Sequence, residues 1–264
     1  MYAFELHRAT SVADAAALLA KSGGRPLAGG QSLVAAMRLR LAQPGALVDL
    51  SGIAELRGIR KAGNALVIGA TTRHAEVAAS GDVKSAIPAL AALAEGIGDR
   101  QVRNMGTLGG SIANNDPAAD WPAGVVALGA TITTNQRQIA ADEFFTGMYE
   151  TALGSEEIIT GVSFPVPRRA GYAKFPNPAS RFALVGVFVA QTGDGSVRVA
   201  VAGAGPCVFR CKPLEDALAA SFTRDAARSA KVDASGLNQD LHGSPEYRAH
   251  LIPVLAGRAV VAAG

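Results

Sequence analysis

A glycine-rich segment in the middle of the chain, residues 99–122, constrains the fold more than any other stretch. It reads DRQVRNMGTLGGSIANNDPAADWP, with three glycines (Gly106, Gly109 and Gly110) and three aspartates in one short run. This composition suits backbone wrapped against a ligand, because glycine permits close approach and positive φ. Successive peptide N–H groups that face one way form a concave site for phosphate oxygens. We interpret the segment as a ligand-binding loop, with an ordinary surface loop as the alternative.

A second stretch of the same kind lies near the N-terminus. Residues 28–32, AGGQS, follow a short apolar run and precede a helical pattern. The order of strand, glycine turn and helix is therefore used twice in one chain. This repetition favours ligand binding over the surface-loop alternative.

Length and charge exclude several classes of protein. The chain has 264 residues and a formal net charge of +3, which suits two medium domains or one large one. Lysines and arginines are dispersed, and a basic stripe with stacking aromatics is not evident, so we expect no nucleic-acid partner. No apolar run is long enough to span a bilayer, and the N-terminus lacks a signal-peptide layout. We expect a cytoplasmic protein without an integral membrane segment.

Side chains that could carry chemistry by themselves are scarce. The two cysteines, Cys207 and Cys211, cannot build a [2Fe–2S] cluster alone, because such a cluster needs four ligands. We interpret both as ordinary thiols. The sequence lacks the G-x-x-x-x-G-K-[ST], H-E-x-x-H and G-x-S-x-G motifs. We predict that His74 is a surface histidine. A cofactor is therefore the natural carrier of any reaction.

The rest of the chain alternates strand and helix patterns. Ser11 and Asp14 form a capping-box-like start for a helix that ends at Gly23. Further helices are expected at residues 31–41, 71–77, 88–97, 121–128, 214–220, 224–231 and 245–262. Strands are expected at residues 2–6, 25–28, 46–50, 56–61, 65–70, 130–134, 137–140, 157–164, 172–175, 182–191 and 196–204. The proline-rich residues 165–169 mark the best domain boundary.

Two motifs give the chain a specific resemblance. AGGQSL and QVRNMGTLGGSIANNDPAADWP resemble the two FAD-binding loops of the flavoprotein (medium) subunit in the xanthine dehydrogenase and carbon monoxide dehydrogenase family of molybdenum hydroxylases. The similarity continues through LRLAQPGALVDLS, IGATTRHAEV, ADEFFTGMYETAL, KFPNPASRFALVGVFVA and HGSPEYRAHLIPVLAGRAV. It therefore covers nearly the whole chain in order.

The resemblance implies an α+β fold in two domains. Residues 1–165 would form a PCMH-type FAD-binding domain of two α+β subdomains, at about 1–54 and 55–165. Residues 170–264 would form a C-terminal domain with a three-stranded antiparallel sheet and helices.

The same resemblance assigns the site residues. Asp120 would hold FAD through its carboxylate, Asn114 and Asp116 would lie near the flavin, and Ile97 would lie near the adenine. Ser111 stands where many relatives carry asparagine. Pro176 and Arg181 stand where some relatives carry a lysine and an acidic residue. The pyrophosphate would be cradled by two runs of residues, Ala28, Gly29, Gly30, Gln31 and Ser32 and Thr107, Leu108, Gly109, Gly110 and Ser111.

The function implied by the resemblance is electron transfer. FAD on this chain would take electrons from an iron–sulfur small subunit and pass them to an external acceptor, while a molybdopterin large subunit hydroxylates the substrate. The [2Fe–2S] clusters and the molybdenum cofactor would lie on those partners, in a dimer of heterotrimers. No histidine or cysteine adjoins either glycine loop in the sequence, which favours noncovalent FAD. The alternatives are a self-sufficient FAD oxidase of the vanillyl-alcohol-oxidase type and a non-redox FAD-binding module.

Overall fold

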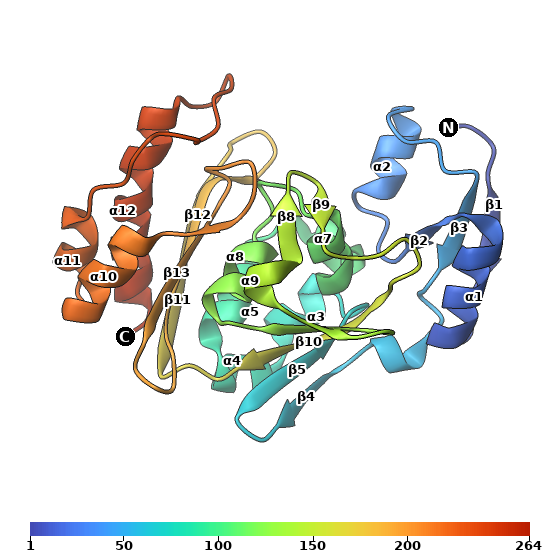
Figure 1. Cartoon of the computed structure of the whole chain (residues 1–264), viewed down its shortest axis with the longest axis horizontal. Helices are drawn as coiled ribbons and strands as arrows, with labels where there is room; N and C mark the ends of the chain where they lie inside the picture. Colours follow the sequence, from blue (N-terminus) through green and yellow to red (C-terminus); the bar gives the residue numbers. More distant parts are fainter.

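The computed structural model describes all residues, 1–264, and contains three larger sheets arranged along the molecule, together with one two-stranded sheet (Figure 1). The first sheet is parallel, with strand order β1-β3-β2, and its helices precede β2 and β3. Ser11 begins the first helix, because its hydroxyl accepts a hydrogen bond from the Asp14 N–H, and Gly23 ends it at φ 60°. The elements are β1 (Glu5–Arg8), α1 (Val12–Ser22), β2 (Arg25–Leu27), α2 (Leu33–Arg38) and β3 (Ala46–Asp49).

The second sheet is antiparallel and has the strand order β4-β5-β10-β6-β7. Its central strand, β10, comes last in the sequence and pairs with β5 on one side and β6 on the other. The sheet is therefore complete only when segments far apart in the sequence pair. The strands are β4 (Ile59–Ala62), β5 (Ala65–Gly69), β6 (Thr131–Thr134), β7 (Gln138–Ala140) and β10 (Ile159–Pro165), and a separate hairpin contains β8 (Phe145–Gly147) and β9 (Glu150–Thr151).

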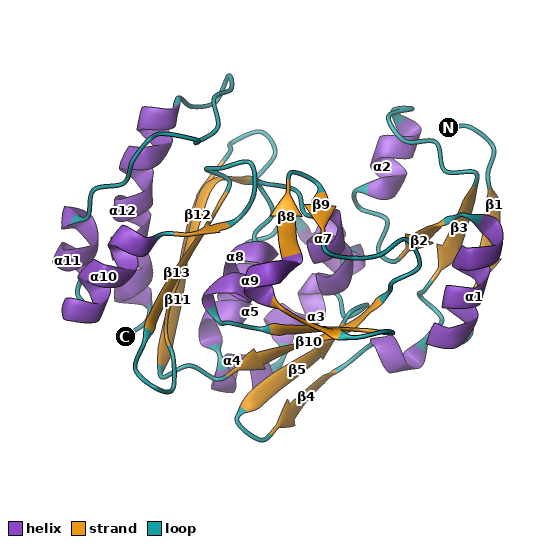
Figure 2. Cartoon of the chain, viewed as in Figure 1, coloured by secondary structure: helices purple, strands orange, loops and turns teal.

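Helices lie against the second sheet, mainly on one side of it, and carry the central glycine segment (Figure 2). Trp121 begins one of them with Pro122 in its first turn, as predicted, and its indole is fully buried. The helices are η1 (Ala54–Leu56), α3 (His74–Ala79), α4 (Gly81–Ala86), α5 (Pro88–Glu95), α6 (Arg100–Met105), α7 (Leu108–Asn114), α8 (Trp121–Ala127) and α9 (Ala141–Phe144).

The third sheet is antiparallel and contains the three expected strands plus a short fourth strand at its edge. Its order is β11 (Arg169–Pro176), β12 (Ala183–Gln191), β13 (Val197–Ala202) and β14 (Phe209–Arg210). The helices α10 (Lys212–Ala220), α11 (Arg224–Ser229) and α12 (Pro245–Ala262) follow. Residues 166–168 connect the second sheet to the third. The domain limits at 165 and 170 stay a prediction.

Strand β12 joins the third sheet firmly to the middle of the molecule. Val185, Val187 and Val189 belong to the core shared with α10 and α12, whereas Phe188 and Ala190 belong to the core of the second sheet. Both faces are therefore covered, which explains why the strand is a continuous apolar run without polar alternation. No helix of the chain is long and apolar enough to cross a membrane.

Candidate functional site

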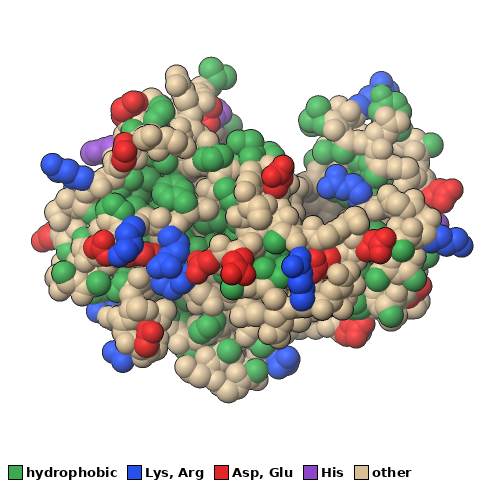
Figure 3. Space-filling view, in the orientation of Figure 1, with side chains coloured by type: hydrophobic (Ala, Val, Ile, Leu, Met, Phe, Trp, Pro, Cys, Tyr) green, Lys and Arg blue, Asp and Glu red, His purple; other side chains and the backbone are tan.

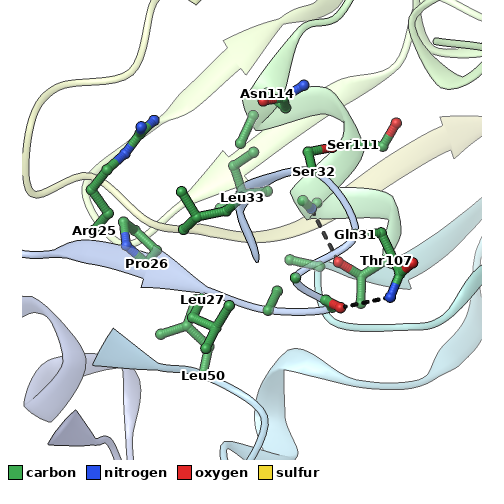
Figure 4. A pocket seen from close by; sticks show the side chains of 18 of the residues that line it. Arg25, Pro26, Leu27, Gln31, Ser32, Leu33, Leu50, Thr107, Ser111 and Asn114 are labelled. Atoms are coloured by element: carbon green, nitrogen blue, oxygen red, sulfur yellow. Dashed lines mark hydrogen bonds between the residues drawn. The ribbon is translucent and has the colours of Figure 1, made fainter. Parts of the chain in front are cut away.

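A cavity of about 480 Å³ lies between the N-terminal sheet and the central helices. The space-filling view shows the surface notched between the N-terminal lobe, at the right, and the rest of the molecule (Figure 3). The first glycine loop, residues 28–32, lines one side of the cavity. The second glycine loop, residues 107–111, lines the other side through all its residues except Leu108. The expectation of an irregular loop is wrong for this second stretch, because Thr107 is the N-cap of α7 and residues 108–111 form its first turn. Figure 4 labels side chains from both loops around this space. The two segments singled out in the sequence are therefore brought together.

At Gly29 the first loop contacts the two residues that precede the second loop. A Cβ atom added there would lie 2.0 Å from the Met105 carbonyl oxygen and 2.8 Å from Gly106 Cα, so only glycine fits. Gly30 has φ 69°, which turns the chain from β2 into α2. This conformation is strained for other residues.

The first glycine loop offers free backbone donors. The N–H groups of Gly29, Gly30, Gln31 and Ser32 donate to no other group of the chain. The Gly30 and Ser32 carbonyls instead accept the first hydrogen bonds of the following helix. A run of unpaired N–H groups beside a cavity suits the oxygens of a diphosphate.

The second glycine loop differs, because its N–H groups are already paired within the protein. Leu108 donates to the Thr72 carbonyl at 3.1 Å, and Gly109 donates to the Ala70 carbonyl at 2.8 Å. Gly110 donates to Thr107 Oγ1 at 3.2 Å, and Ser111 donates to the Thr107 carbonyl at 3.0 Å. The expectation that both loops present free peptide donors is therefore wrong for residues 108–111. The polar side chains of this region remain available to a ligand.

Most of the predicted cofactor-binding residues line the cavity, and three do not. Those that do are Ala28, Gly29, Gly30, Gln31, Ser32, Thr107, Gly109, Gly110, Ser111, Asn114 and Asp116. Leu108 is fully buried in the main core, and Ile97 is packed against that core. Neither these two residues nor Asp120 is in the cavity wall. Whether each residue contacts FAD stays a prediction.

Asp120 lies instead in a buried polar cluster behind the second glycine loop. Its carboxylate accepts hydrogen bonds from the Tyr172 hydroxyl at 2.5 Å and from Lys174 Nζ at 2.9 Å. Lys174 also donates to the Gly96 carbonyl at 2.9 Å. Burial raises the pKa of Asp120, and the Lys174 ammonium opposes that rise. Through this cluster, β11 of the third sheet contacts Asp120 near the end of the central segment and Gly96 just before its start.

The prediction that His74 is a surface histidine is wrong. The predicted surface histidine is only 4% exposed, and it lines the cavity. Its Nδ1 accepts a hydrogen bond of 3.0 Å from the Trp121 indole N–H. Burial, with a smaller effect from Arg103, lowers the pKa of His74 to about 4. The imidazole is therefore neutral at physiological pH, and it lies beside the second glycine loop although the sequence keeps the two apart.

Sequence reasoning also missed the outer wall of the cavity. Seven residues between 151 and 159 line it together with Phe182, which directly precedes β12 in the third sheet. Glu157 in this wall accepts hydrogen bonds from Arg137 and Thr134. The Arg137 guanidinium is the main cause that lowers the pKa of Glu157 to about 2. No local motif marks these residues, because chain folding alone brings them to the glycine loops.

A cavity between glycine turns from two parts of one α+β chain, with free N–H donors on one side, is typical of a nucleotide-binding flavoprotein. Residues 2–167 match the family model described as the FAD binding domain in molybdopterin dehydrogenase. The nicotine 6-hydroxylase medium subunit of Paenarthrobacter nicotinovorans is 36% identical, over 96% of this chain and 95% of that protein. The carbon monoxide dehydrogenase medium chain of Afipia carboxidovorans is 37% identical, over 97% and 95%.

A solved structure agrees with these sequence matches. A chain of the reconstituted CO dehydrogenase from Oligotropha carboxidovorans superposes with a TM-score of 0.90 at 33% identity, over 99% of this chain and 98% of that one. The protein therefore belongs to the FAD-binding medium subunits of the xanthine dehydrogenase and carbon monoxide dehydrogenase family of molybdenum hydroxylases. It is an oxidoreductase subunit with an FAD-binding domain, and the unpaired donors of the first loop fit the FAD diphosphate.

Proposed function

We propose that this chain is the electron-transfer subunit of a molybdenum hydroxylase. It receives electrons from an iron–sulfur subunit and passes them to an external acceptor, while a molybdopterin subunit carries out substrate hydroxylation. The complex is a cytoplasmic dimer of heterotrimers, with the clusters and the molybdenum cofactor on the partner subunits. FAD, when bound, supplies the redox chemistry, because a flavin exchanges electrons singly or in pairs.

The observation that carries this proposal is the state of the acid–base side chains in the cavity wall. His74, Asp116 and Glu157 are the histidine and carboxylates there, and each is already engaged within the protein. His74 Nδ1 accepts from Trp121, and Glu157 accepts from Arg137 and Thr134.

Asp116 is engaged in the same way. Its Oδ1 accepts from the Ala118 N–H at 2.9 Å, and its Oδ2 accepts from the Tyr149 hydroxyl at 3.3 Å. A self-sufficient oxidase needs a free base to take a proton from its organic substrate. This wall offers donors and fixed acceptors, which suits the holding of a cofactor.

The chain's own groups have distinct tasks in holding FAD. The N–H groups of Gly29 to Ser32 bind the diphosphate. The hydroxyls of Thr107 and Ser111 and the amide of Asn114 orient the cofactor from the other side. Phe182 covers it and limits access of water. We further propose that the attachment is noncovalent, since His74 Nδ1 is occupied by Trp121 and its Nε2 faces the Gly106 backbone.

Turnover by the purified single chain tests the main proposal. The chain with bound FAD is supplied with aldehydes, purines or carbon monoxide and an artificial dye as electron acceptor. We expect chemical reduction of the flavin by dithionite but no sustained turnover of any substrate. Coexpression with the neighbouring genes should yield a complex that contains iron, sulfur and molybdenum. Sustained turnover by the single chain would favour the self-sufficient oxidase instead.

Acid precipitation tests the mode of attachment. We expect the flavin to appear in the supernatant as FAD. Flavin that stays with the pellet would contradict noncovalent binding, and recovery of FMN would contradict the diphosphate site.

A further inference from the structure

One buried hydrogen bond connects the core of the molecule to the place where the two glycine loops meet. Trp121 is fully buried and packs at 6.4 Å, centroid to centroid, against Phe164 of the second sheet. Its indole N–H donates to His74 Nδ1 at 3.0 Å. Because an indole N–H can only donate, Nδ1 must be the acceptor and the proton of the imidazole must lie on Nε2. Trp121 thereby fixes both the tautomer and the orientation of the ring.

The other side of His74 supports Gly106, the residue just before the second glycine loop. Its main-chain N–H donates to the Gly106 carbonyl at 3.0 Å. A Cβ atom added to Gly106 would lie 2.7 Å from His74 Nε2 and 2.9 Å from Cδ2, so the ring rests directly against this glycine. Any displacement of the ring is therefore passed to residue 106.

Residue 106 in turn supports the first glycine loop. An added Cβ on Gly29 would lie 2.0 Å from the Met105 carbonyl oxygen, so Gly29 is seated on the peptide between residues 105 and 106. The free N–H groups of residues 29–32 begin at this contact. A continuous series of packed groups runs from Trp121 through His74 and Gly106 to these donors.

We propose that His74 is a positioning residue for FAD, which holds the junction of the two glycine loops so that the free N–H groups of the first loop keep the spacing of a diphosphate. It acts through its packing against Gly106 and, through Gly106, against Gly29. The hydrogen bond from Trp121 fixes the orientation of its own ring. This role rests on the binding of FAD to this chain. It does not depend on the identity of the electron partner, since it concerns the affinity for FAD alone.

The test is a titration of the full chain, stripped of flavin, with FAD. His74→Leu keeps an apolar side chain of similar size but removes the acceptor for Trp121. We expect its dissociation constant for FAD to rise at least tenfold. His74→Asn places a carbonyl oxygen near the position of Nδ1 and should recover most of the affinity lost in His74→Leu. The change in the flavin's own absorbance spectrum on binding reports the titration in every variant, including the one that lacks Trp121, the only tryptophan.

Phe164→Leu provides the matched control. Phe164 is equally buried against Trp121, but it lies on β10 and does not line the cavity. Its replacement should lower the urea midpoint of unfolding while the affinity for FAD stays within about twofold of the parent value. The control thus distinguishes a loss of stability, seen in the urea midpoint, from a loss of FAD positioning, seen in the affinity for FAD.

Two further variants keep the test decisive if His74→Leu does not fold. Trp121→Phe removes the same hydrogen bond from the donor side, and Gly106→Ala pushes the ring from the other face. Both should weaken FAD binding at least tenfold. An affinity within twofold of the parent in these variants, or no recovery in His74→Asn, would overturn the positioning role.

Discussion

The two glycine loops share a composition but use their glycines in different ways. In the first loop, Gly30 supplies a positive φ and the N–H groups of residues 29–32 are left free. In the second loop, the N–H groups of residues 108–111 are paired within the chain. There, Gly109 lets the loop pack against Ala70, since an added Cβ would lie 2.6 Å from the Ala70 Cβ.

The two loops therefore have different roles in the site. The first loop presents hydrogen-bond donors to the cofactor, and the second loop provides a rigid wall and a few polar side chains. Glycine richness alone does not distinguish these roles, because both need backbone that comes close to another group. The following substitutions test the division, from the largest expected effect to the smallest.

Gly110→Val should have the largest effect on FAD binding. Gly110 is the exposed glycine of the second loop, and an added Cβ would lie 3.9 Å from the Ala28 Cβ of the first loop. A β-branched side chain would fill the space between the loops, and we expect affinity to fall about a hundredfold, or ~3 kcal/mol. Flavin titration measures this loss. Gly81→Val, at a helical glycine in open space, is the control and should bind FAD normally.

Gly109→Ala should instead reduce the stability of the fold. The added methyl group would meet the Ala70 carbonyl oxygen at 2.8 Å and Cα at 3.0 Å, and overpacking of this kind costs about 1–3 kcal/mol. Urea unfolding measures the change. Ala70→Gly in the same chain removes the nearest atom and should restore part of the loss. A variant of unchanged stability that no longer binds FAD would contradict the supporting role of this loop.

Gly30→Ala should weaken FAD binding about tenfold with a smaller change in stability. The left-handed conformation costs an alanine about 1–2 kcal/mol, and relaxation of the turn would redirect the free N–H groups. The comparison with Gly109→Ala is informative, because both introduce one methyl group. Equal losses of affinity in the two variants would argue against a division of roles.

Acid should destabilise the wall opposite the loops. The folded-state pKa of Glu157 is about 2, below its ordinary value near 4.5, because Arg137 and neighbouring donors favour the carboxylate. This contribution to stability is fully present above pH 4.5 and is lost as the pH falls toward 2. We expect the urea midpoint to decline over that range and Glu157→Gln to flatten the decline. An identical decline in Glu157→Gln would assign the acid sensitivity to other groups.

Much of the fold was predictable from local patterns. Ser11 and Gly23 bound α1 as expected, the Gly63–Asn64 turn joins β4 to β5, and Trp121 starts α8. These features depend on caps, turns and side-chain periodicity within a few residues. Strand β14 was missed, because two residues give too short a pattern to recognise. The central segment was interpreted as a loop but contains two short helices, α6 and α7.

The candidate site was only partly predictable. Both glycine loops were found, since their composition is unusual wherever they lie in space. His74 was misjudged because its partner, Trp121, is 47 positions away in the sequence. Phe182 and residues 151–159 carry no local signal, and the pairing of β10 between β5 and β6 brings part of that wall to the cavity.

The sequence by itself determined most of the elements, the two glycine-rich segments and the family, because these are properties of short segments and their order. Only the tertiary structure decided which N–H groups are free. A backbone donor that is already hydrogen-bonded to a carbonyl from elsewhere in the chain is not available to the cofactor. The Thr72 and Ala70 carbonyls do this for Leu108 and Gly109 of the second loop, while Thr107 pairs the next two N–H groups locally. No group of the chain pairs the donors of the first loop. Long-range pairing thus converts two similar sequences into one donor surface and one support.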